Sequence, residues 1–194
     1  MSRRAAAAVM LAGAALSSCA VPPQRKAVEA APEPEHPPAL APATLGAQHE
    51  VQQVLRVAFG EREATLRCVV VAHTDHLAVI VLNAMGQRLL SLDWDGIQWK
   101  TASAPMVPSQ LHPQQLVADL QFALWPASAL TAAYRGTGWD ISEPGGGVRR
   151  LRHEGRLFAE VHYAGGDPWA GRLWMSNFRY GYALAIEPAA PPGP

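Results

Sequence analysis

Two neighbouring stretches of the chain predict strands that are apolar on both faces, and they constrain the fold more than any other feature. They are Val69-Val70-Val71, within a strand expected over residues 64–72, and the run from Leu77 to Leu82; a polar corner at His73 to Asp75 joins them. Such strands need cover on each side, which excludes a flat sheet with one face open to water. The sheet must therefore be layered or strongly curved.

Other strands follow from apolar residues that alternate with period two. The first is expected over residues 51–59, where Leu55 and Val57 share a face. Later strands are expected over residues 148–152, 156–163, 171–176 and 180–187. A His153-Glu154-Gly155 loop, with positive φ at its glycine, would join the first two of these and place Leu151 opposite Leu157.

Asp95-Gly96 predicts a hairpin with a two-residue turn. This register pairs Trp94 with Ile97 and Leu92 with Trp99. One side of the hairpin is then apolar and shielded from solvent, and both tryptophans lie on that side.

One helix is expected from Pro113 to Trp125, and a second, short helix over residues 127–134. The apolar stripe of the first helix contains Leu116, Leu120 and either Ala123 or Leu124. The fold class is α+β and mainly antiparallel β. About ten strands would form a curved half-barrel, with the helical insertion across its concave face, an arrangement that makes a pocket.

The N-terminus predicts a lipoprotein signal peptide over residues 1–18. Arg3 and Arg4 precede an uncharged, largely apolar run from Ala5 to Leu16, which as a helix would be only about 18 Å long and too short to span a bilayer. Leu16-Ser17-Ser18-Cys19 resembles the bacterial lipobox, so Cys19 is the expected site of lipidation. The alternative is an ordinary secretory signal with a chance cysteine.

The segment after Cys19 predicts a tether. Residues 20–50 contain seven prolines and many alanines, without an apolar period of helix or strand. The folded domain is expected over residues 51–187, followed by an unstructured tail over residues 188–194. The residue after the lipobox cysteine is Ala20, and resemblance to enteric-type lipoproteins implies outer-membrane sorting, with the domain facing the periplasm.

Composition excludes one class of partner and leaves little room for catalysis. Sixteen basic residues balance sixteen acidic ones and form no basic stripe, which argues against nucleic acid. The chain contains no Gly-x-Ser-x-Gly elbow and no phosphate-binding loop. Cys68 is the only cysteine besides Cys19, and its apolar surroundings predict a buried, unpaired thiol.

Two polar pairs have residue types that occur in chemical sites. His73-x-x-His76 has metal-ligand residue types, but only Asp75 is a carboxylate beside it in the sequence, so a solvated turn is expected. Glu160 and His162 share a strand face with arginines, which favours a compensated surface over an acid-base pair. We therefore expect no enzyme activity, no cofactor and no metal.

Three motifs carry a resemblance to a known family, over about residues 45–186. They are Asn83-Ala84-Met85-Gly86-Gln87-Arg88-Leu89, Leu120-Gln121-Phe122-Ala123-Leu124-Trp125-Pro126 and Arg179-Tyr180-Gly181-Tyr182. The chain resembles an uncharacterised bacterial outer-membrane lipoprotein family, and its order of elements is similar to that of LolA and LolB, the periplasmic carrier and outer-membrane receptor for lipoproteins. The resemblance implies handling of a lipid or acyl product.

The ligand-binding hypothesis places an apolar cavity between the sheet and the first helix. The protein would be a monomer that binds or transfers a lipid, acyl product or lipoprotein, with a LolA-like carrier as a candidate partner. The alternatives are a structural or interaction lipoprotein without a ligand and, third, an enzyme. The expected wall and lid residues are Leu55, Val57, Leu90, Leu92, Trp94, Trp99, Leu116, Leu120 and Leu124.

Overall fold

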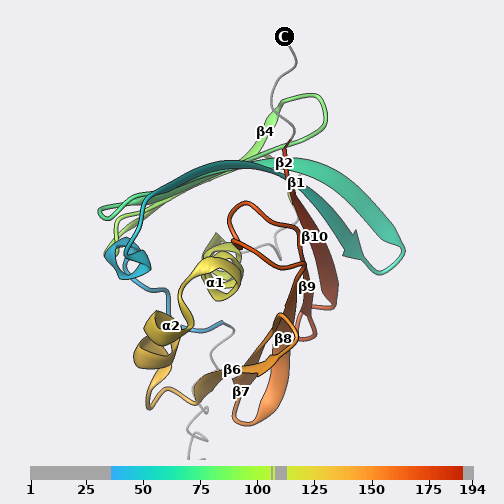
Figure 1. Cartoon of the computed structure of the whole chain (residues 1–194). Helices are drawn as coiled ribbons and strands as arrows, with labels where there is room; N and C mark the ends of the chain where they lie inside the picture. The colour runs from blue at the N-terminus through green and yellow to red at the C-terminus, as the bar shows by residue number, and fades with distance from the viewer. Residues whose placement is uncertain (1–35, 106, 108–112, 190–194) are drawn as a thin grey trace, which may run out of the picture. The chain divides into compact units, whose positions relative to one another are not determined.

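A single open sheet of ten antiparallel strands curves around one helix (Figure 1). The computed structural model describes residues 36–105, 107 and 113–189. Its elements are η1 (Pro42–Leu45), β1 (His49–Phe59), β2 (Arg62–Ala72), β3 (Leu77–Leu82), β4 (Arg88–Trp94), β5 (Trp99–Ser103), α1 (Pro113–Leu124), α2 (Ala127–Tyr134), β6 (Trp139–Gly145), β7 (Val148–His153), β8 (Arg156–Tyr163), β9 (Leu173–Asn177) and β10 (Tyr182–Pro188).

The strand order β5-β4-β3-β2-β1-β10-β9-β8-β7-β6 explains how the sheet encloses α1. The chain runs outward from β1 to one edge, crosses through α1 and α2 to the other edge, and returns strand by strand to β10, which pairs with β1. The helices therefore connect the two edges, and α1 lies inside the curve (Figure 1). The expected half-barrel of about ten strands with a helical insertion is confirmed at this level.

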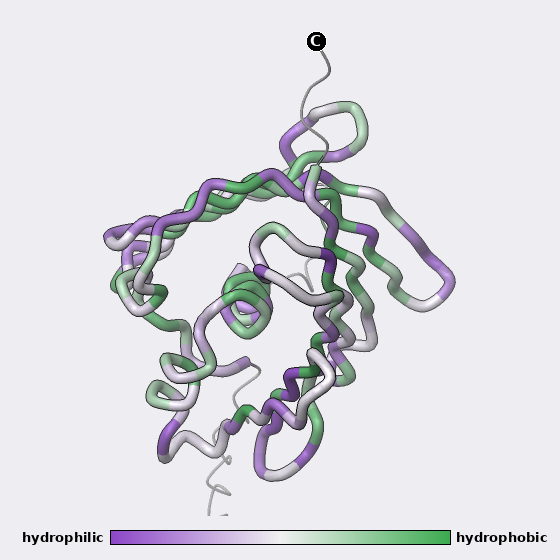
Figure 2. Tube along the Cα trace, in the orientation of Figure 1, coloured by the Kyte–Doolittle hydropathy of each residue, from purple (hydrophilic) through white to green (hydrophobic). Residues whose placement is uncertain are grey.

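The inward face of the sheet forms the core together with α1. Figure 2 shows hydrophobic residues along α1, inside the curve of the sheet. On β2 from Cys68 onward, on β3, and on β4 from Leu90 onward, every second residue is buried, as a period of two requires. These buried residues are Cys68, Val70, Ala72, Leu77, Val79, Val81, Leu90, Leu92 and Trp94.

Helix α1 is buried on most of its surface, instead of along one stripe. Val117 and Phe122 are fully buried, whereas Leu116 and Leu120 of the predicted stripe are only partly buried. The stripe prediction assumed a helix that covers a sheet from one side. Because the sheet curves around α1, several faces of the helix contact protein.

The expected tether is shorter on its C-terminal side than the sequence suggests. Leu40 and Leu45 belong to the core, and the Trp94 Nε1 donates a hydrogen bond of 2.9 Å to the Leu40 carbonyl. β1 already begins at His49. The sequence does not indicate this packing, because prolines and alanines dominate the segment and two leucines are too few to show an apolar period.

The N-terminal predictions fall outside the described residues. These are the signal peptide, Cys19 and residues 20–35 of the tether. The same holds for residues 190–194, while Pro188, assigned to the tail, ends β10 instead. Neither helix in the described part of the chain is long and apolar enough to cross a membrane.

The register predicted for the Asp95-Gly96 hairpin is wrong. Trp94 pairs with Trp99, so the loop contains four residues and Ile97 is 83% exposed. The Asp95 carboxylate accepts hydrogen bonds from the backbone N–H groups of Ile97 (2.8 Å) and Gln98 (2.7 Å). This side-chain bonding supports a longer turn than the two-residue type, and the two indole rings stack with centroids 3.9 Å apart.

The register of the β7–β8 hairpin also differs from the prediction. His153 pairs with Arg156, which leaves a two-residue turn in which Glu154 (φ 48°) and Gly155 (φ 75°) both have positive φ. The expected positive φ at Gly155 is confirmed. A register shift after Leu151 pairs that residue with Ala159, and Leu157 is exposed.

β6 is the one strand of the described sheet that the sequence patterns did not predict. Trp139 and Ile141 alternate as in a strand, but Pro144 lies close behind them. Proline is tolerated there because β6 is an edge strand.

Candidate functional site

The predicted wall and lid residues do meet inside the half-barrel, but as packed core. Five are buried and the other four are partly buried against the same core, so α1 occupies the space where a cavity was expected. The buried residues are Leu55, Leu90, Leu92, Trp94 and Leu124, and the partly buried ones are Val57, Trp99, Leu116 and Leu120.

Two hollows among the described residues are lined by strands of the sheet. One, of about 380 Å³, lies over β1, β2, β9 and β10 and includes Arg56 and Trp174. The other, of about 320 Å³, lies over β3, β4 and β5 and includes Ile80. Neither is lined by a residue of α1.

A buried polar cluster fastens α1 to β9 and β10. The Asp119 carboxylate accepts hydrogen bonds from Gln115 (2.8 Å), from Asn177 (3.2 Å) and from the Tyr182 hydroxyl. Asp119 and Asn177 are 5% and 1% exposed, so these bonds are shielded from water. We call Gln115, Asp119, Asn177 and Tyr182 the polar latch.

Burial also changes the acidity of the latch. It raises the pKa of Asp119 to about 6, against the opposing effect of hydrogen bonds from Tyr182, Gln115 and Asn177. Burial, and then the nearby Asp119 charge, raise the pKa of the Tyr182 hydroxyl. The latch therefore changes charge through Asp119 in mildly acidic conditions.

A second polar contact joins α1 to the N-terminal segment. The Gln121 side chain is fully buried; it donates to the Leu40 carbonyl and accepts from the Leu40 N–H, both at 2.8 Å. One turn further on, Trp125 Nε1 donates to the Thr44 hydroxyl at 3.0 Å. The segment that leads back toward Cys19 is thus bonded directly to the helix inside the half-barrel.

The C-terminal end of α1 is held by side chains of β7 and β8. Helices leave their last carbonyl groups without partners inside the helix. Arg149 Nη1 donates to the carbonyls of Phe122 and Trp125, both at 2.8 Å, and the Tyr163 hydroxyl donates to that of Ala123 at 2.7 Å. The positive charge of Arg149 also suits the negative end of the helix dipole.

Sequence reasoning did not predict the latch or the Arg149 contacts. The available signal was an aspartate inside the apolar stretch Leu116-Val117-Ala118-Asp119-Leu120. Asn177 and Tyr182 are 58 and 63 residues further along the chain, so the sequence does not show that they pair with it.

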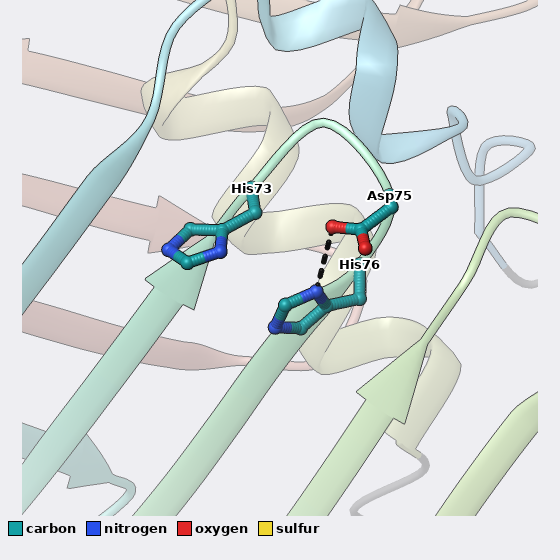
Figure 3. Close-up of side chains that lie close together, drawn as sticks. All are labelled: His73, Asp75 and His76. Atoms are coloured by element: carbon teal, nitrogen blue, oxygen red, sulfur yellow. Dashed lines mark hydrogen bonds and ion pairs between the residues drawn. The ribbon is translucent and has the colours of Figure 1, made fainter.

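The turn between β2 and β3 brings His73, Asp75 and His76 together (Figure 3). The His76 Nδ1 lies 2.8 Å from the Asp75 carboxylate, and the hydrogen bond from His76 is the main cause that lowers the pKa of Asp75. In the sequence, Asp75 is the only carboxylate next to these two histidines. The structure adds Glu50, whose Oε1 lies 3.0 Å from the His73 Nε2, because β1 and β2 run side by side.

Glu160 and His162 lie on the outward face, as expected. His162 Nε2 lies 2.6 Å from Glu160 Oε1, and Arg150 donates to Glu160 Oε2 at 2.5 Å. These bonds, with the one from Arg150 the stronger cause, lower the pKa of Glu160. The pair is therefore part of a compensated ion-pair group, which matches the interpretation from sequence.

Cys68 is buried and free, as predicted. Burial raises the pKa of its thiol to about 12. Because the thiolate is the reactive form, this cysteine is inert in the folded protein.

Comparison with known proteins identifies a family and no characterised relative. The search of curated proteins finds no match. A family model covers residues 50–190, which contain all ten strands except the first residue of β1, and both helices. The chain therefore belongs to the family described as "Protein of unknown function (DUF3261)".

Proposed function

We propose that the protein is a lipid-anchored envelope protein that binds an acyl chain against the inner wall of the half-barrel when α1 moves aside. It acts by binding, without catalysis. One observation carries this proposal: the helix that covers the apolar wall is fastened by polar contacts at Asp119, Gln121 and the end next to Arg149.

Exchange of α1 for an acyl chain breaks polar contacts of the helix and buries the methylenes of the chain. Hydrogen bonds of α1 that break in water are replaced by bonds to water, at a net cost of about 1 kcal/mol each. The Asp119 carboxylate regains its hydration when the latch opens. An acyl chain gains about 0.8 kcal/mol per buried CH₂, so about a dozen methylenes offset several broken polar contacts.

The apolar wall is suited to such an exchange. Residues of β2, β3 and β4, such as Val70, Val79 and Leu92, present an inward surface without charged groups. A wall of this kind binds alkyl chains with few directed contacts, so the proposed specificity is loose. The proposed cargo is a lipid, an acyl product or the acyl part of a lipoprotein.

The proposed location and partner follow from the sequence resemblance. A lipid on Cys19 would hold the domain at the outer membrane, facing the periplasm, as in LolB-like proteins. A soluble LolA-like carrier would then exchange cargo with it. The contact between Gln121 and Leu40 supports a link between the anchored segment and the helix that must move.

A reversible lock on α1 tests the proposal. We expect the variant Asp119→Cys/Asn177→Cys, whose native side chains contact each other, to bind a fluorescent fatty acid when reduced. Formation of the disulfide should lower the affinity at least tenfold, because α1 can no longer leave the wall. Probe titration before and after reduction measures this in one preparation, in a background where Cys19 and Cys68 are replaced by serine so that only the introduced pair can form a disulfide.

The matched control is Ser176→Cys/Ala183→Cys, a cross-strand pair of β9 and β10 that leaves α1 free. Its affinity for the probe should not depend on oxidation. Equal binding by the locked and unlocked forms of the first variant would contradict movement of α1. The formation of each disulfide is confirmed by mass spectrometry of the linked peptides.

A second candidate is a structural or interaction lipoprotein without a ligand. The packed interior favours it, since α1 already fills the half-barrel with buried side chains. This candidate predicts no probe binding by the wild type or by either reduced double variant, and no lipid in extracts of the purified protein. The same titration therefore decides between the two functions.

The proposed anchor has its own test. Replacing Cys19 by serine should abolish incorporation of labelled palmitate and release the protein from membranes, because the serine hydroxyl is not the thiol that accepts the diacylglyceryl group. Cys68→Ser is the control and should keep both label and membrane attachment. Continued attachment of the Cys19→Ser protein would refute the lipid anchor.

A further inference from the structure

We propose that the turn between β2 and β3 is a binding site for a divalent transition metal of the zinc class, with His73, Asp75 and His76 as its ligands. This inference does not depend on acyl binding. Two imidazole nitrogens and a carboxylate oxygen are donors that zinc, copper and nickel accept, whereas magnesium and calcium prefer oxygen alone.

The turn itself brings the donors together. Ala72 pairs with Leu77 at the strand ends, and His73 N donates to the His76 carbonyl at 2.9 Å, which closes the turn. The two imidazole rings then lie with centroids 4.9 Å apart. Both rings project to the same side, as Figure 3 shows.

The donor spacing is close to that of a bound set. One donor atom from each of the three residues lies within 4.8 Å of the others. Ligand atoms held tetrahedrally at about 2.0–2.2 Å from zinc are about 3.4 Å apart. Side-chain rotations that move the donor atoms by little more than 1 Å would therefore bring all three to this spacing. The two histidine side chains are only partly buried and Asp75 is exposed, so such movements meet little resistance.

A carboxylate behind one histidine strengthens the inference. Glu50 Oε1 lies 3.0 Å from His73 Nε2 and comes from β1, a different strand. Carboxylates bonded to metal-ligating histidines orient the ring and raise its basicity. Glu50 is therefore assigned a positioning role. Among the described residues, no other group of three histidine, cysteine or acidic side chains has this spacing.

Isothermal titration calorimetry with ZnCl₂ tests the site. The full-length chain is used in detergent, without a polyhistidine tag. We expect one ion per chain, and at least a tenfold loss of affinity in His73→Ala and in His76→Ala. Glu50→Gln should weaken binding by a smaller factor, consistent with a role through His73. MgCl₂ should give no binding heat, because two of the three donors are nitrogens.

The control variant is His162→Ala. His162 also contacts a carboxylate, at 2.6 Å, but lies on β8 without a second histidine beside it, so zinc affinity should be unchanged. The proposal is overturned if the wild type does not bind zinc, or if the turn variants and His162→Ala bind it equally well.

Discussion

Replacing Arg149 by leucine is expected to lower the free energy of unfolding by about 3 kcal/mol. The guanidinium donates to the carbonyls of Phe122 and Trp125, and the side chain is only 8% exposed. Leucine fills part of the volume but leaves two buried carbonyls without a donor, each at a cost of about 1–3 kcal/mol. Urea denaturation followed by linear extrapolation measures the loss.

Two further variants show whether the loss comes from these carbonyls. Arg149→Lys should recover only part of the stability, because an ammonium group lacks the fork that serves several acceptors at once. Arg152→Leu, on the same strand, is the matched control and should cost less than 1 kcal/mol, since Arg152 contacts the Ser142 hydroxyl at a half-buried position. Equal losses in Arg149→Leu and Arg152→Leu would contradict the assigned role.

Replacing Asp119 by asparagine is expected to stabilise the protein at pH 7, by an amount on the order of 3 kcal/mol. Burial raises the pKa of this carboxyl from 3.8 to about 6 in the folded state. The folded protein therefore holds a proton that the unfolded chain releases between about pH 4 and pH 6. A shift of roughly two pH units corresponds to about 3 kcal/mol.

The sign of the pH dependence follows from this shift. The stabilising contribution of protonated Asp119 is fully present below about pH 4 and is lost as the pH rises to about 6. Asparagine stays neutral and keeps an acceptor oxygen for Gln115 and Asn177 while its amide donates to the Tyr182 oxygen. The difference in unfolding free energy between variant and wild type should therefore grow between pH 4 and pH 6 and then stay constant.

Denaturation at half-unit pH steps measures this difference. Comparing two proteins cancels the opposite effects of carboxyls with lowered pKa values, such as Glu160, whose contributions are lost at low pH. Asp140→Asn changes an exposed aspartate on β6 and should leave the wild-type pH profile in place. A difference that is flat from pH 4 to pH 7 would show that Asp119 is not buried in the latch.

The pH dependence bears on the proposed movement of α1. Above about pH 6 the latch holds a charged carboxylate in a buried position, which destabilises the packed form. Acyl binding by the wild type should accordingly be stronger at pH 7.5 than at pH 5, and this difference should disappear in Asp119→Asn. That outcome would link the latch to the function we propose.

Local patterns in the sequence determined the elements of this protein and the class of its fold. Apolar runs, period-two alternation and the Asp95-Gly96 turn together predicted nine of the ten strands, and Pro113 and Pro126 marked the limits of α1. Apolar residues on both faces of β2 and β3 required a curved or layered sheet. These inferences succeed because they depend on residues close together in the chain.

Only the tertiary structure decided the register of the hairpins and the contents of the half-barrel. Asp95 selects a four-residue loop through its own side-chain bonds, which pairs Trp94 with Trp99 against the preference of Asp-Gly. The predicted cavity is filled because the curved sheet surrounds α1. No periodicity in the helix reveals how many of its faces will be covered.

The candidate sites also depend on contacts that sequence spacing does not show. Asp119 meets Tyr182 63 residues away, and His73 meets Glu50 through the pairing of β1 with β2. A buried carboxyl changes its pKa only after folding excludes water from it, and a metal site needs donors from fixed positions. The sequence determined which strands and helices form, and the tertiary structure decided which polar groups they bring together.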